Sequence, residues 1–539
     1  MARATLKQLL SVVVVGVLLL AGLWSQCGPT PITRAPQPLQ VAYKDIECQI
    51  NGEYSVACLR QEEQVWLPFS FVHKYFEVYG ELGQSADGSE RFDFWHATAK
   101  VYKPKADYDP QGVFLFFDNY NVEVRDRVKC VSADEGVPIS TQWDPSGYYY
   151  PTQVAQFGLA HYSKNLTQPL PTRQTLEDGG DSASAKWISA SSSSFKRISD
   201  SERQSKVLLF TGRLHTVTAA DLPYLDVDVL FKANSSLWVA VEQKGQPTRR
   251  IHYVCGQDRP VWADGRDAFY GMGSCGRWIR LSRDLALDLH KAIRTPRRPR
   301  GLQVVAIGLD GEGRLDDLSI ASGSNHGALF WASAQWFVRH QTSEGGWQIP
   351  VRRRLAAGMS VLAPGWLSAM AQGHAASILA RAYLRSGDKK YLTAAENGLR
   401  PFRVASARGG VRTSLWGHPW FEEYPTSPPS LVLNGFIYAL LGLHDLRVIG
   451  RSKEAAALYA EGLASLRALL PLYDMGSGSV YDLRHVTVGC APNVARWDYH
   501  ATHVNQLLLL ATVEPAEELL ARTANRWANY MLGHRAAHN

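Results

Sequence analysis

The chain has 539 residues, of which 45% are hydrophobic and 20% are charged, and its formal net charge is +7. This length and composition exclude a disordered chain and leave room for two or three domains with a sizeable core. The mild positive excess fits an acidic partner such as an anionic polysaccharide, a nucleic acid or a membrane surface, without choosing among them. The 16 tryptophans and 23 tyrosines can build a core or stack against sugars.

An uncharged apolar run occupies residues 9–24, and Arg3 and Lys7 precede it. The run is shorter than the roughly 20 residues that cross an average bilayer, so a cleaved signal peptide is the alternative to a membrane anchor. Positive charge before the run predicts a cytosolic N-terminus and a lumenal body. We therefore expect residues 1–25 to form the cytoplasmic tail and signal-anchor of a single-pass type II membrane protein, with the proline-rich residues 26–40 as a stem.

Two sequons and the cysteine pattern agree with exposure to the secretory lumen. The sequons begin at Asn165 and Asn234, which are candidate glycosylation sites. The seven cysteines form no CxxC pattern and no zinc spacing. Cys48–Cys58 and Cys255–Cys275 are spaced for local disulfides. The sequence leaves the pairing open, and the odd count leaves at least one thiol unpaired within the chain.

Short apolar runs alternate with polar residues over 41–150, which predicts a β-rich N-terminal region. Its clearest part is a predicted β-hairpin, with an apolar run from Val113 to Phe117, a turn near Asp118 and then alternating valines. On the second strand, three charged residues would share the face opposite the valines: Glu123, Arg125 and Arg127. That face could grip an acidic substrate, or it could be an ordinary exposed face crossed by salt bridges.

Strand-like runs recur over 151–325, and their spacing predicts a β-sandwich. After about residue 325, apolar residues follow a three- and four-residue spacing with little glycine or proline inside. Helices are predicted at 326–341, 364–386, 388–403, 430–448, 452–470, 500–512 and 515–532. Helical hairpins with short loops can close into an α/α toroid. The expected fold class is α+β, in which the β-hairpin and β-sandwich precede an α/α toroid over 326–539.

Three segments of the helical half combine acids, tyrosines and arginine, at residues 422–425, 481–485 and 496–500. The first begins Glu422-Glu423-Tyr424 and runs into three prolines, which would stiffen the backbone that presents Glu423 and Tyr424. Proton transfer is one use for such a segment, and a solvated turn before a helix is the ordinary alternative. The third segment adds a histidine pair at i, i+3, His500 and His503, but no third metal ligand stands nearby in sequence.

An acidic loop contains Glu177, Asp178 and Asp181, and Asp316 or Asp317 could approach it from a later strand. Calcium prefers several oxygen ligands, so this loop is a candidate calcium site. A solvated loop without a metal has the same composition. The residues alone do not separate these two interpretations.

Six stretches of the chain are distinctive as whole motifs. They are YNVEVRDRVKC (120–130), GLAHYSKNLT (158–167), LAPGWLSAMAQG (362–373), EEYPTSPPSLVLNGFIYALLGLHDL (422–446), LPLYDMGSGSVYDLRH (470–485) and APNVARWDYHATHVNQL (491–507). Together they resemble the heparan sulfate/heparin D-glucuronyl C5-epimerase family. The resemblance runs from about residue 100 to the end, and the serine-rich stretch at 182–205 departs from the family's pattern.

The resemblance implies inversion of carbon 5 of D-glucuronate within N-sulfated heparosan, the precursor of heparan sulfate and heparin, to give L-iduronate. It implies a membrane-anchored homodimer in the Golgi, a glycosaminoglycan rather than a nucleic acid as partner, and no cofactor for catalysis. The catalytic positions that it carries over are Glu423, Tyr424, Tyr481, Tyr499, Tyr162 and Tyr108. The substrate-binding candidates are Arg484, Arg496, Tyr120, Asn121, Arg125 and Arg127. It also favours a structural calcium ion at Glu177 and Asp316.

The proton at carbon 5 lies next to a carboxylate, so its removal creates a dianionic enolate. An arginine beside the carboxylate would neutralise that charge, and Arg484 is the candidate. Glu423 would be the base if burial raises its pKa, and Tyr481 or Tyr499 would serve the opposite face. A tyrosine base needs nearby cations such as Arg484 or Arg496, because its ordinary pKa is about 10. The alternatives are a uronate-specific polysaccharide lyase and a non-catalytic heparan-binding protein.

Overall fold

The computed structural model describes residues 43–50, 52, 54–68, 79–95, 100–180, 183–295 and 298–537. The predicted anchor and stem lie outside these residues. Within them, no helix combines the length and the apolar character needed to cross a membrane. The chain divides into two compact units, residues 1–97 and residues 98–539, and each is described by itself.

The first unit is a five-stranded sheet with the strand order β3-β2-β1-β5-β4. Its strands are β1 Lys44–Ile50, β2 Tyr54–Gln61, β3 Gln64–Trp66, β4 Tyr79–Gln84 and β5 Glu90–Trp95. Every second side chain of β1 is buried, as expected for a sheet with one covered face. The predicted Cys48–Cys58 disulfide is present and joins β1 to β2 within this small core.

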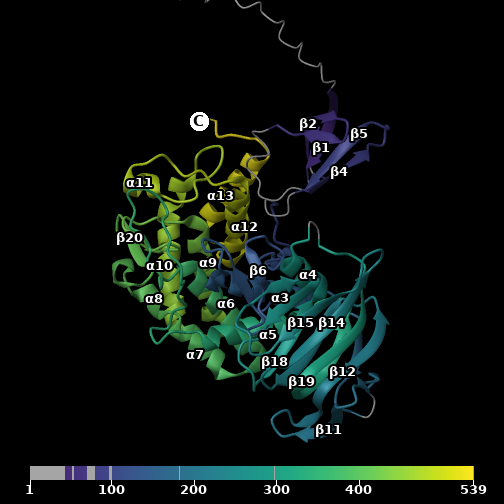
Figure 1. The fold of residues 1–539 in the computed structure, drawn as a ribbon. Helices are drawn as coiled ribbons and strands as arrows, with labels where there is room; N and C mark the ends of the chain where they lie inside the picture. Colours follow the sequence, from purple (N-terminus) through teal and green to yellow (C-terminus); the bar gives the residue numbers. More distant parts are fainter. Residues whose placement is uncertain are drawn as a thin grey trace, which may run out of the picture. The chain divides into compact units, whose positions relative to one another are not determined.

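The second unit contains a large β-sandwich followed by helices (Figure 1). The sandwich strands are β9 Arg173–Glu177, β10 Ile188–Ser189, β11 Ser194–Asp200, β12 Ser205–Ala220, β13 Tyr224–Phe231, β14 Ser236–Gln243, β15 Arg249–Val254, β16 Trp262–Asp264, β17 Asp267–Gly271, β18 Trp278–Asp284 and β19 Leu302–Ala321. The long strand β19 pairs with β14 through its first half and with β13 through its second half. One strand therefore belongs to both layers, and the buried faces of these strands form one hydrophobic core.

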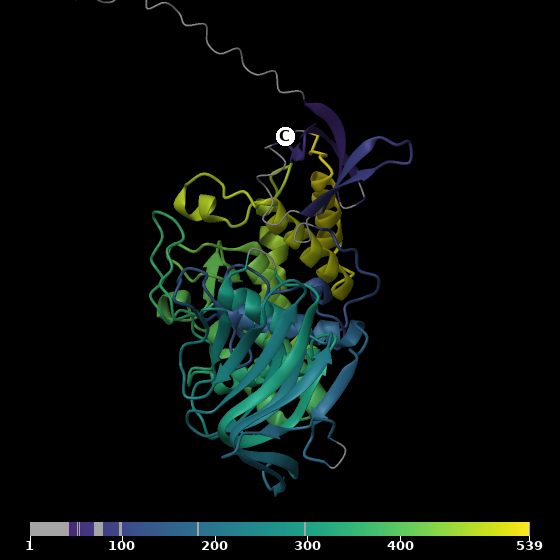
Figure 2. The same ribbon diagram turned by 45° about the vertical axis from the view of Figure 1, so that its right-hand side comes forward.

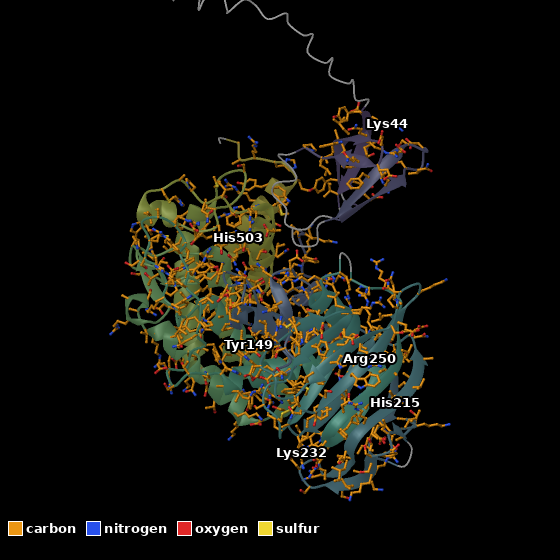
Figure 3. The ribbon with its side chains drawn as sticks, in the orientation of Figure 1. Lys44, Tyr149, His215, Lys232, Arg250 and His503 are labelled. Atoms are coloured by element: carbon orange, nitrogen blue, oxygen red, sulfur yellow. A yellow bond between two sulfur atoms is a disulfide. The ribbon has the colours of Figure 1, made fainter. Side chains whose placement is uncertain are left out.

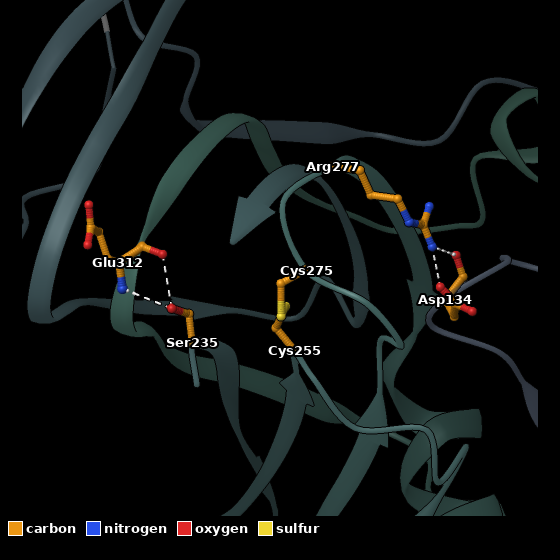
Figure 4. The surroundings of a disulfide bond; sticks show 6 residues. All are labelled: Asp134, Ser235, Cys255, Cys275, Arg277 and Glu312. Atoms are coloured by element: carbon orange, nitrogen blue, oxygen red, sulfur yellow. Dashed lines mark hydrogen bonds and ion pairs between the residues drawn. A yellow bond between two sulfur atoms is a disulfide. The ribbon is translucent and has the colours of Figure 1, made fainter. Parts of the chain in front are cut away.

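A disulfide and two polar contacts fasten one end of the sandwich (Figure 4). The predicted Cys255–Cys275 disulfide is present. The Ser235 hydroxyl donates to the backbone carbonyl of Glu312 at 2.9 Å and accepts from its N–H at 2.9 Å. Arg277 forms an ion pair with Asp134, which belongs to the segment that precedes the sandwich. The disulfide and the Ser235 hydrogen bonds thus hold this end of the sandwich together. The Arg277–Asp134 ion pair connects it to the segment that precedes the sandwich.

The helical part follows the predicted pattern closely. Its elements are α5 His326–Arg339, α6 Ala369–Ser386, α7 Lys389–Asn397, α8 Arg400–Arg403, α9 Leu433–Ile449, α10 Lys453–Leu469, α11 Arg484–Val488, α12 Trp497–Val513 and α13 Glu518–Met531, with a short hairpin of β20 Arg412–Leu415 and β21 His418–Phe421. The helix α9 is apolar nearly all round, and its residues from Leu433 to Leu446 are buried. A helix without a polar face must lie inside the protein, which makes α9 the centre of the helical part.

A helix that the sequence analysis did not predict, α3 Pro151–Thr167, packs against α5 and α6. Its first 14 residues are all buried, so its sequence lacks the alternation of polar and apolar faces that reveals a surface helix. Figures 1 and 2 show α3 and α5 between the strands of the sandwich and the remaining helices. The helical part therefore begins before the sandwich in sequence, and the sandwich strands begin at Arg173.

The prediction of a β-hairpin over residues 113–128 is wrong. Residues 113–127 form turns and one short 3₁₀ helix at Phe117–Asn119, and the next strand along the chain is β6 Val128–Val131. Phe114, Phe117 and Val122 are completely buried, so this segment packs against helices through irregular turns rather than through one strand face. Consequently Glu123, Arg125 and Arg127 do not share a strand face. The strand β6 pairs with β7 Pro138–Ser140, and β7 pairs with β8 Tyr148–Tyr149.

Candidate active site

The segment FEEYPTSPPS connects β21 to α9 and folds back on itself. The buried carboxylate of Glu422 accepts hydrogen bonds from the Ser430 hydroxyl at 2.7 Å and from the N–H of Leu431 at 3.1 Å. The Thr426 hydroxyl donates to the carbonyl of Pro428 at 2.9 Å. Burial raises the pKa of Glu422 to about 8. Glu422 therefore closes the loop, and its neighbour Glu423 is the acid presented beyond it.

Glu423 lies against the first turn of α9 and is only 4% exposed. A Cβ atom added at Gly435 would come within 2.4 Å of Glu423 Oε2 and 2.7 Å of its Cβ. No real Cβ tolerates such contacts, so the carboxylate occupies the space that a side chain at position 435 would need. The Glu423 Oε2 atom has no hydrogen-bond partner among the described residues.

A pocket of about 100 Å³ opens at this carboxylate. Five residues expected from the sequence line it: Glu423, Tyr424, Tyr499, Tyr120 and Arg127. Nine further residues complete its wall: Gln142, Tyr150, Thr152, Gln153, Gln156, Met370, Asn434, Tyr438 and Thr502. Tyr481 stands just behind them, with its ring centroid 4.8 Å from that of Tyr499. The chain thus gathers tyrosines and one buried carboxylate from segments far apart in sequence.

Burial gives this carboxylate the properties of a proton carrier near neutral pH. Burial raises the pKa of Glu423 to about 7. Hydrogen bonds from Tyr424 and Tyr481 and the positive charge of Arg353 lower this pKa, but burial outweighs them. The pKa of Tyr499 is also raised, first by burial and then by the charges of Glu423 and Asp498. A carboxyl group that titrates near 7 can act as a base, whereas a phenol with a raised pKa stays protonated and can act as an acid.

This electrostatic pattern contradicts the expectation that nearby arginines create a tyrosine base. The charges of Arg127 and Arg496 do lower the pKa of Tyr499, but burial and the neighbouring carboxylates outweigh them. The guanidinium of Arg496 lies 5.4 Å from the Tyr499 ring centroid, so it faces the ring. The pKa of Tyr481 lies well above its usual value for the same reason, burial.

Arg484, expected to bind the substrate carboxylate, is paired with a buried acid of its own chain. Its Nε donates to both carboxylate oxygens of Asp482 at 2.9 Å, and its Nη2 lies 2.7 Å from Oδ2. The Asp482 carboxylate also accepts from Asn493 Nδ2 at 2.7 Å. Arg484 does not line the pocket. Its charge is therefore largely neutralised before any substrate arrives.

Comparisons with known proteins identify the family to which the chain belongs. The family described as "D-glucuronyl C5-epimerase C-terminus" matches residues 340–529, and "D-glucuronyl C5-epimerase, beta-sandwich domain" matches residues 204–312. A D-glucuronyl C5-epimerase of Caenorhabditis elegans is 37% identical in an alignment of 568 positions, gaps included, that covers 92% of each chain. The chain belongs to the D-glucuronyl C5-epimerase family.

Two weaker similarities add little to this family assignment. An uncharacterized protein of Methanocaldococcus jannaschii is 32% identical over 172 residues, covering 31% of this chain and 53% of that protein. The family 11 carbohydrate-binding module of a Clostridium thermocellum cellulase matches 28% of this chain and 95% of its own, with 14% identity and a TM-score of 0.17. At that TM-score the likeness carries no structural argument.

Two tyrosines expected to be catalytic from the epimerase family lie away from the pocket. The Tyr108 hydroxyl donates to Asp445 Oδ1 at 2.8 Å and accepts from Arg381 at 2.9 Å. The Tyr162 hydroxyl donates to the carbonyl of Gln111 at 2.7 Å, and Arg381 faces its ring. Asp445 follows the pocket residue Asn434 by about 16 Å along α9, at 1.5 Å rise per residue. Both tyrosines thus belong to a different part of the helical core.

Other substrate-binding candidates of the epimerase have partners within the chain. The Asn121 amide oxygen accepts from Lys164 Nζ at 2.6 Å, and the Arg125 guanidinium lies 4.3 Å from the Tyr120 ring centroid. The histidine pair is structural, because the Ser479 hydroxyl lies 2.8 Å from His500 Nδ1 and 2.9 Å from His503 Nδ1. Figure 3 places His503 within the helical part.

The expected calcium ligands Glu177 and Asp316 have hydrogen-bond partners within the chain, and calcium binding there stays a prediction. The Glu177 carboxylate accepts from Arg197 at 2.9 and 3.1 Å, from Trp187 Nε1 at 3.0 Å and from the N–H of Gly179 at 2.9 Å. The Asp316 carboxylate accepts from Arg203 at 3.3 Å and from Ser205 at 3.1 Å. Asp181 lies outside the described residues. Across the described ranges, no group of three His, Cys, Asp or Glu side chains could hold a metal ion.

The sequence analysis missed the wall of the pocket that α3 supplies. Tyr150 precedes this helix, and Thr152, Gln153 and Gln156 lie in its first two turns. Pro151 at the first helical position is a helix-start signal that could have revealed α3. Nothing in the sequence placed this helix start beside Glu423, because the two segments are about 270 residues apart and meet only in the folded chain.

Proposed function

We propose that the chain epimerises carbon 5 of D-glucuronate to L-iduronate within N-sulfated heparosan. The observation that carries this proposal is Glu423, a buried carboxyl whose pKa is raised to about 7 and which shares one pocket with protonated tyrosines. Family membership supports the same reaction, since the related protein of Caenorhabditis elegans is named a D-glucuronyl C5-epimerase. Proton removal and return need two groups with separated proton affinities, and this pocket supplies them.

The reaction divides into two proton transfers in this proposal. The Glu423 carboxylate takes the proton from carbon 5, and the C–H electron pair forms the carbon–carbon double bond of the enolate. The Tyr499 hydroxyl then gives its proton to the opposite face of carbon 5. The phenolate left on Tyr499 regains a proton from Glu423 through Tyr481, which hydrogen-bonds to Glu423 and touches the Tyr499 ring. No proton is gained or lost overall, and the scheme requires no cofactor.

We also propose that the protein is a Golgi enzyme of the single-pass type II class, anchored by residues 9–24, and that it assembles as a homodimer. Two disulfides support an oxidising lumen, because such bonds persist in the secretory pathway. The sequon residue Asn234 is exposed, and Asn165 stands near the exposed end of α3. We further propose that the helices from α5 to α13 close into an α/α toroid around the buried α9.

The decisive experiment uses the full chain with N-sulfated heparosan in heavy water. The expected result is deuterium at carbon 5 and the appearance of iduronate by NMR, with unchanged chain length. Chain shortening with a 4,5-double bond would instead establish a polysaccharide lyase. Binding without either change would establish a non-catalytic heparan-binding protein.

The matched variant for this experiment is Glu423→Gln. It keeps the shape of the side chain and removes the base, so we expect carbon 5 exchange to fall by at least three orders of magnitude with an unchanged melting temperature. Glu422→Gln is the control, because Glu422 closes the loop and does not line the pocket. Normal exchange by folded Glu423→Gln would remove Glu423 from the mechanism.

A further inference from the structure

Three helices that begin at the pocket lack a capping side chain among the described residues, as do α8, α11 and α13, none of which lines the pocket. Five helices elsewhere start with a side chain that accepts a hydrogen bond from their first turn: Asp284 for α4, Asn325 for α5, Ser368 for α6, Asp388 for α7 and Ser452 for α10. In the part of the chain that the structure describes, no side chain caps α3, α9 or α12 in this way. Each of these three contributes residues of its first turn to the pocket wall.

The first turn of α3 also carries a buried side chain without partners. Gln153 is 3% exposed, and neither its Oε1 nor its Nε2 has a hydrogen-bond partner among the described residues. Asn434 at the start of α9 is 4% exposed, and its Oδ1 is likewise unpartnered. Leaving such a buried polar group without a hydrogen-bond partner destabilises the folded chain. Two amides of this kind in one pocket wall point to a ligand that completes their hydrogen bonds.

The charge balance of the pocket indicates which ligand group meets Gln153. Glu423 brings negative charge into the pocket, and the charge of Asp498 acts on the pocket residue Tyr499, whose pKa it raises. Of the described residues that line the pocket, Arg127 alone is positive, and Arg484 is committed to Asp482. A substrate carboxylate in this pocket therefore meets one positive side chain, Arg127, and draws its other hydrogen bonds from neutral donors such as the Gln153 amide. The uncapped N-terminal turn of α3 supplies N–H groups and a positive dipole end.

We propose that Gln153, together with the first turn of α3, binds the carboxylate of the uronate whose carbon 5 reacts. This inference rests on the proposed epimerase function. The Gln153 Nε2 donates to one carboxylate oxygen, and its hydrogen bond strengthens as negative charge moves onto that oxygen in the enolate. A neutral amide does this without lowering the pKa of Glu423, whereas an added arginine would stabilise the Glu423 carboxylate and weaken it as a base.

The test uses the variant Gln153→Met in the full chain. Methionine has a similar volume and removes the two unpartnered polar atoms, so we expect a melting temperature equal to or above that of the wild type. We expect kcat/KM for carbon 5 exchange to fall at least tenfold. Gln153→Glu places a like charge beside the substrate carboxylate and should lower kcat/KM further. Gln335→Met and Gln335→Glu, at an exposed position of α5, are the matched controls and should change neither quantity.

A competition measurement separates carboxylate binding from a general structural role. Carboxyl-reduced heparosan lacks the carboxylate, so the wild type should bind it more weakly than N-sulfated heparosan of the same length and sulfation. In Gln153→Met this preference should shrink at least fivefold. A folded Gln153→Met that keeps the full preference would overturn the proposal for Gln153. Absence of carbon 5 exchange in the wild type would instead overturn the proposed function, so the two failures are distinguishable.

Discussion

Glu423 owes its chemistry to its surroundings, and the pH dependence of turnover should show this. Its pKa is raised to about 7, and its deprotonated form is the base. We therefore expect kcat to fall about tenfold per pH unit below 7 and to level off above it. The plateau should persist well into alkaline pH, because the pKa of Tyr499 is raised and the phenol stays protonated. The pH profile of carbon 5 exchange measures both limits.

Removal of Arg353 should move that profile in a known direction. The positive charge of Arg353 lowers the pKa of Glu423, so Arg353→Ala should raise this pKa and shift the acidic limb of the profile to higher pH. Arg352→Ala is the control, since Arg352 is exposed and is not among the causes that shift the Glu423 pKa. A limb that stays in place, or moves to lower pH, would show that another group controls the profile.

Gly435 positions Glu423, and its replacement should separate activity from stability. In Gly435→Ala the new Cβ would lie 2.4 Å from Glu423 Oε2, so the carboxylate must move. We expect kcat to fall at least 100-fold, while the helix gains about 1 kcal/mol of intrinsic propensity that offsets part of the strain. Exchange kinetics and chemical denaturation of the same sample measure the two effects.

A matched glycine stands in the first turn of α5. A Cβ at Gly327 would meet its nearest atoms at 3.6 Å, an ordinary contact, so Gly327→Ala should keep full activity. If Gly435→Ala were as active as Gly327→Ala, the carboxylate would not depend on the space that Gly435 leaves. Position 435 would then be a helix residue without a role in the chemistry.

At the scale of elements, a buried ion pair joins the two central helices. Arg381 on α6 and Asp445 on α9 are fully buried, their charged atoms are 2.5 Å apart, and Tyr108 bridges them. Tyr108→Phe removes one hydrogen bond to each partner. We expect a loss of about 1–3 kcal/mol in the free energy of unfolding and a kcat within threefold of the wild type. Chemical denaturation measures the loss of stability, and exchange kinetics measure kcat. A stable Tyr108→Phe variant with a reduced kcat would show that Tyr108 takes part in catalysis.

An element could be predicted well when its own residues determine its structure, and poorly when the elements packed around it do. The helix α10 has a regular polar face and a Ser452 cap, so its sequence defines it to within a residue or two. The helix α3 is buried on all sides, and residues 113–127 alternate in polarity while packing through turns. Their structure is set by the elements around them, which a local pattern does not contain.

The residues of the candidate site also differ in how far their own sequence motifs predicted their roles. Glu423, Tyr424 and Tyr499 stood in distinctive segments and do meet in one pocket. Arg484 stood in such a segment as well, but its partner Asp482 neutralises it. Gln153 stood in no motif that suggested chemistry, because an isolated glutamine gains a role only from the pocket around it. Residue type predicts what a group can do, and only the fold decides what remains available to it.

At the scale of the whole molecule, Arg283 connects the sandwich to the small sheet that leads into the pocket. Its guanidinium pairs with Asp288 at 2.7 Å and donates to the carbonyls of Val131 at 3.0 Å and Ser132 at 3.2 Å, all in a buried setting. The same small sheet contains β8, and Tyr150 directly follows it at the start of α3. Tyr149 of β8 is labelled at the junction of strands and helices in Figure 3.

Because of this connection, the sandwich and the helical part should unfold together. Arg283→Ala leaves Asp288 buried without its cation, which costs about 3–5 kcal/mol, and it removes the donor to the carbonyls of Val131 and Ser132. We expect the wild-type second unit to unfold in one calorimetric transition that coincides with the loss of carbon 5 exchange. In Arg283→Ala, exchange should be lost at a lower temperature than the main transition.

Arg280 provides the control for this coupling. It lies three residues earlier on β18, on the opposite face of the strand, and pairs with Asp228 and Asp317 within the sandwich. Arg280→Ala should lower the transition temperature modestly while exchange and unfolding stay coincident, because its ion pairs are partly exposed and contribute little. If both variants kept the two events together, the sandwich and the pocket would be coupled through contacts other than Arg283, such as the packing of α3 against α5 and α6.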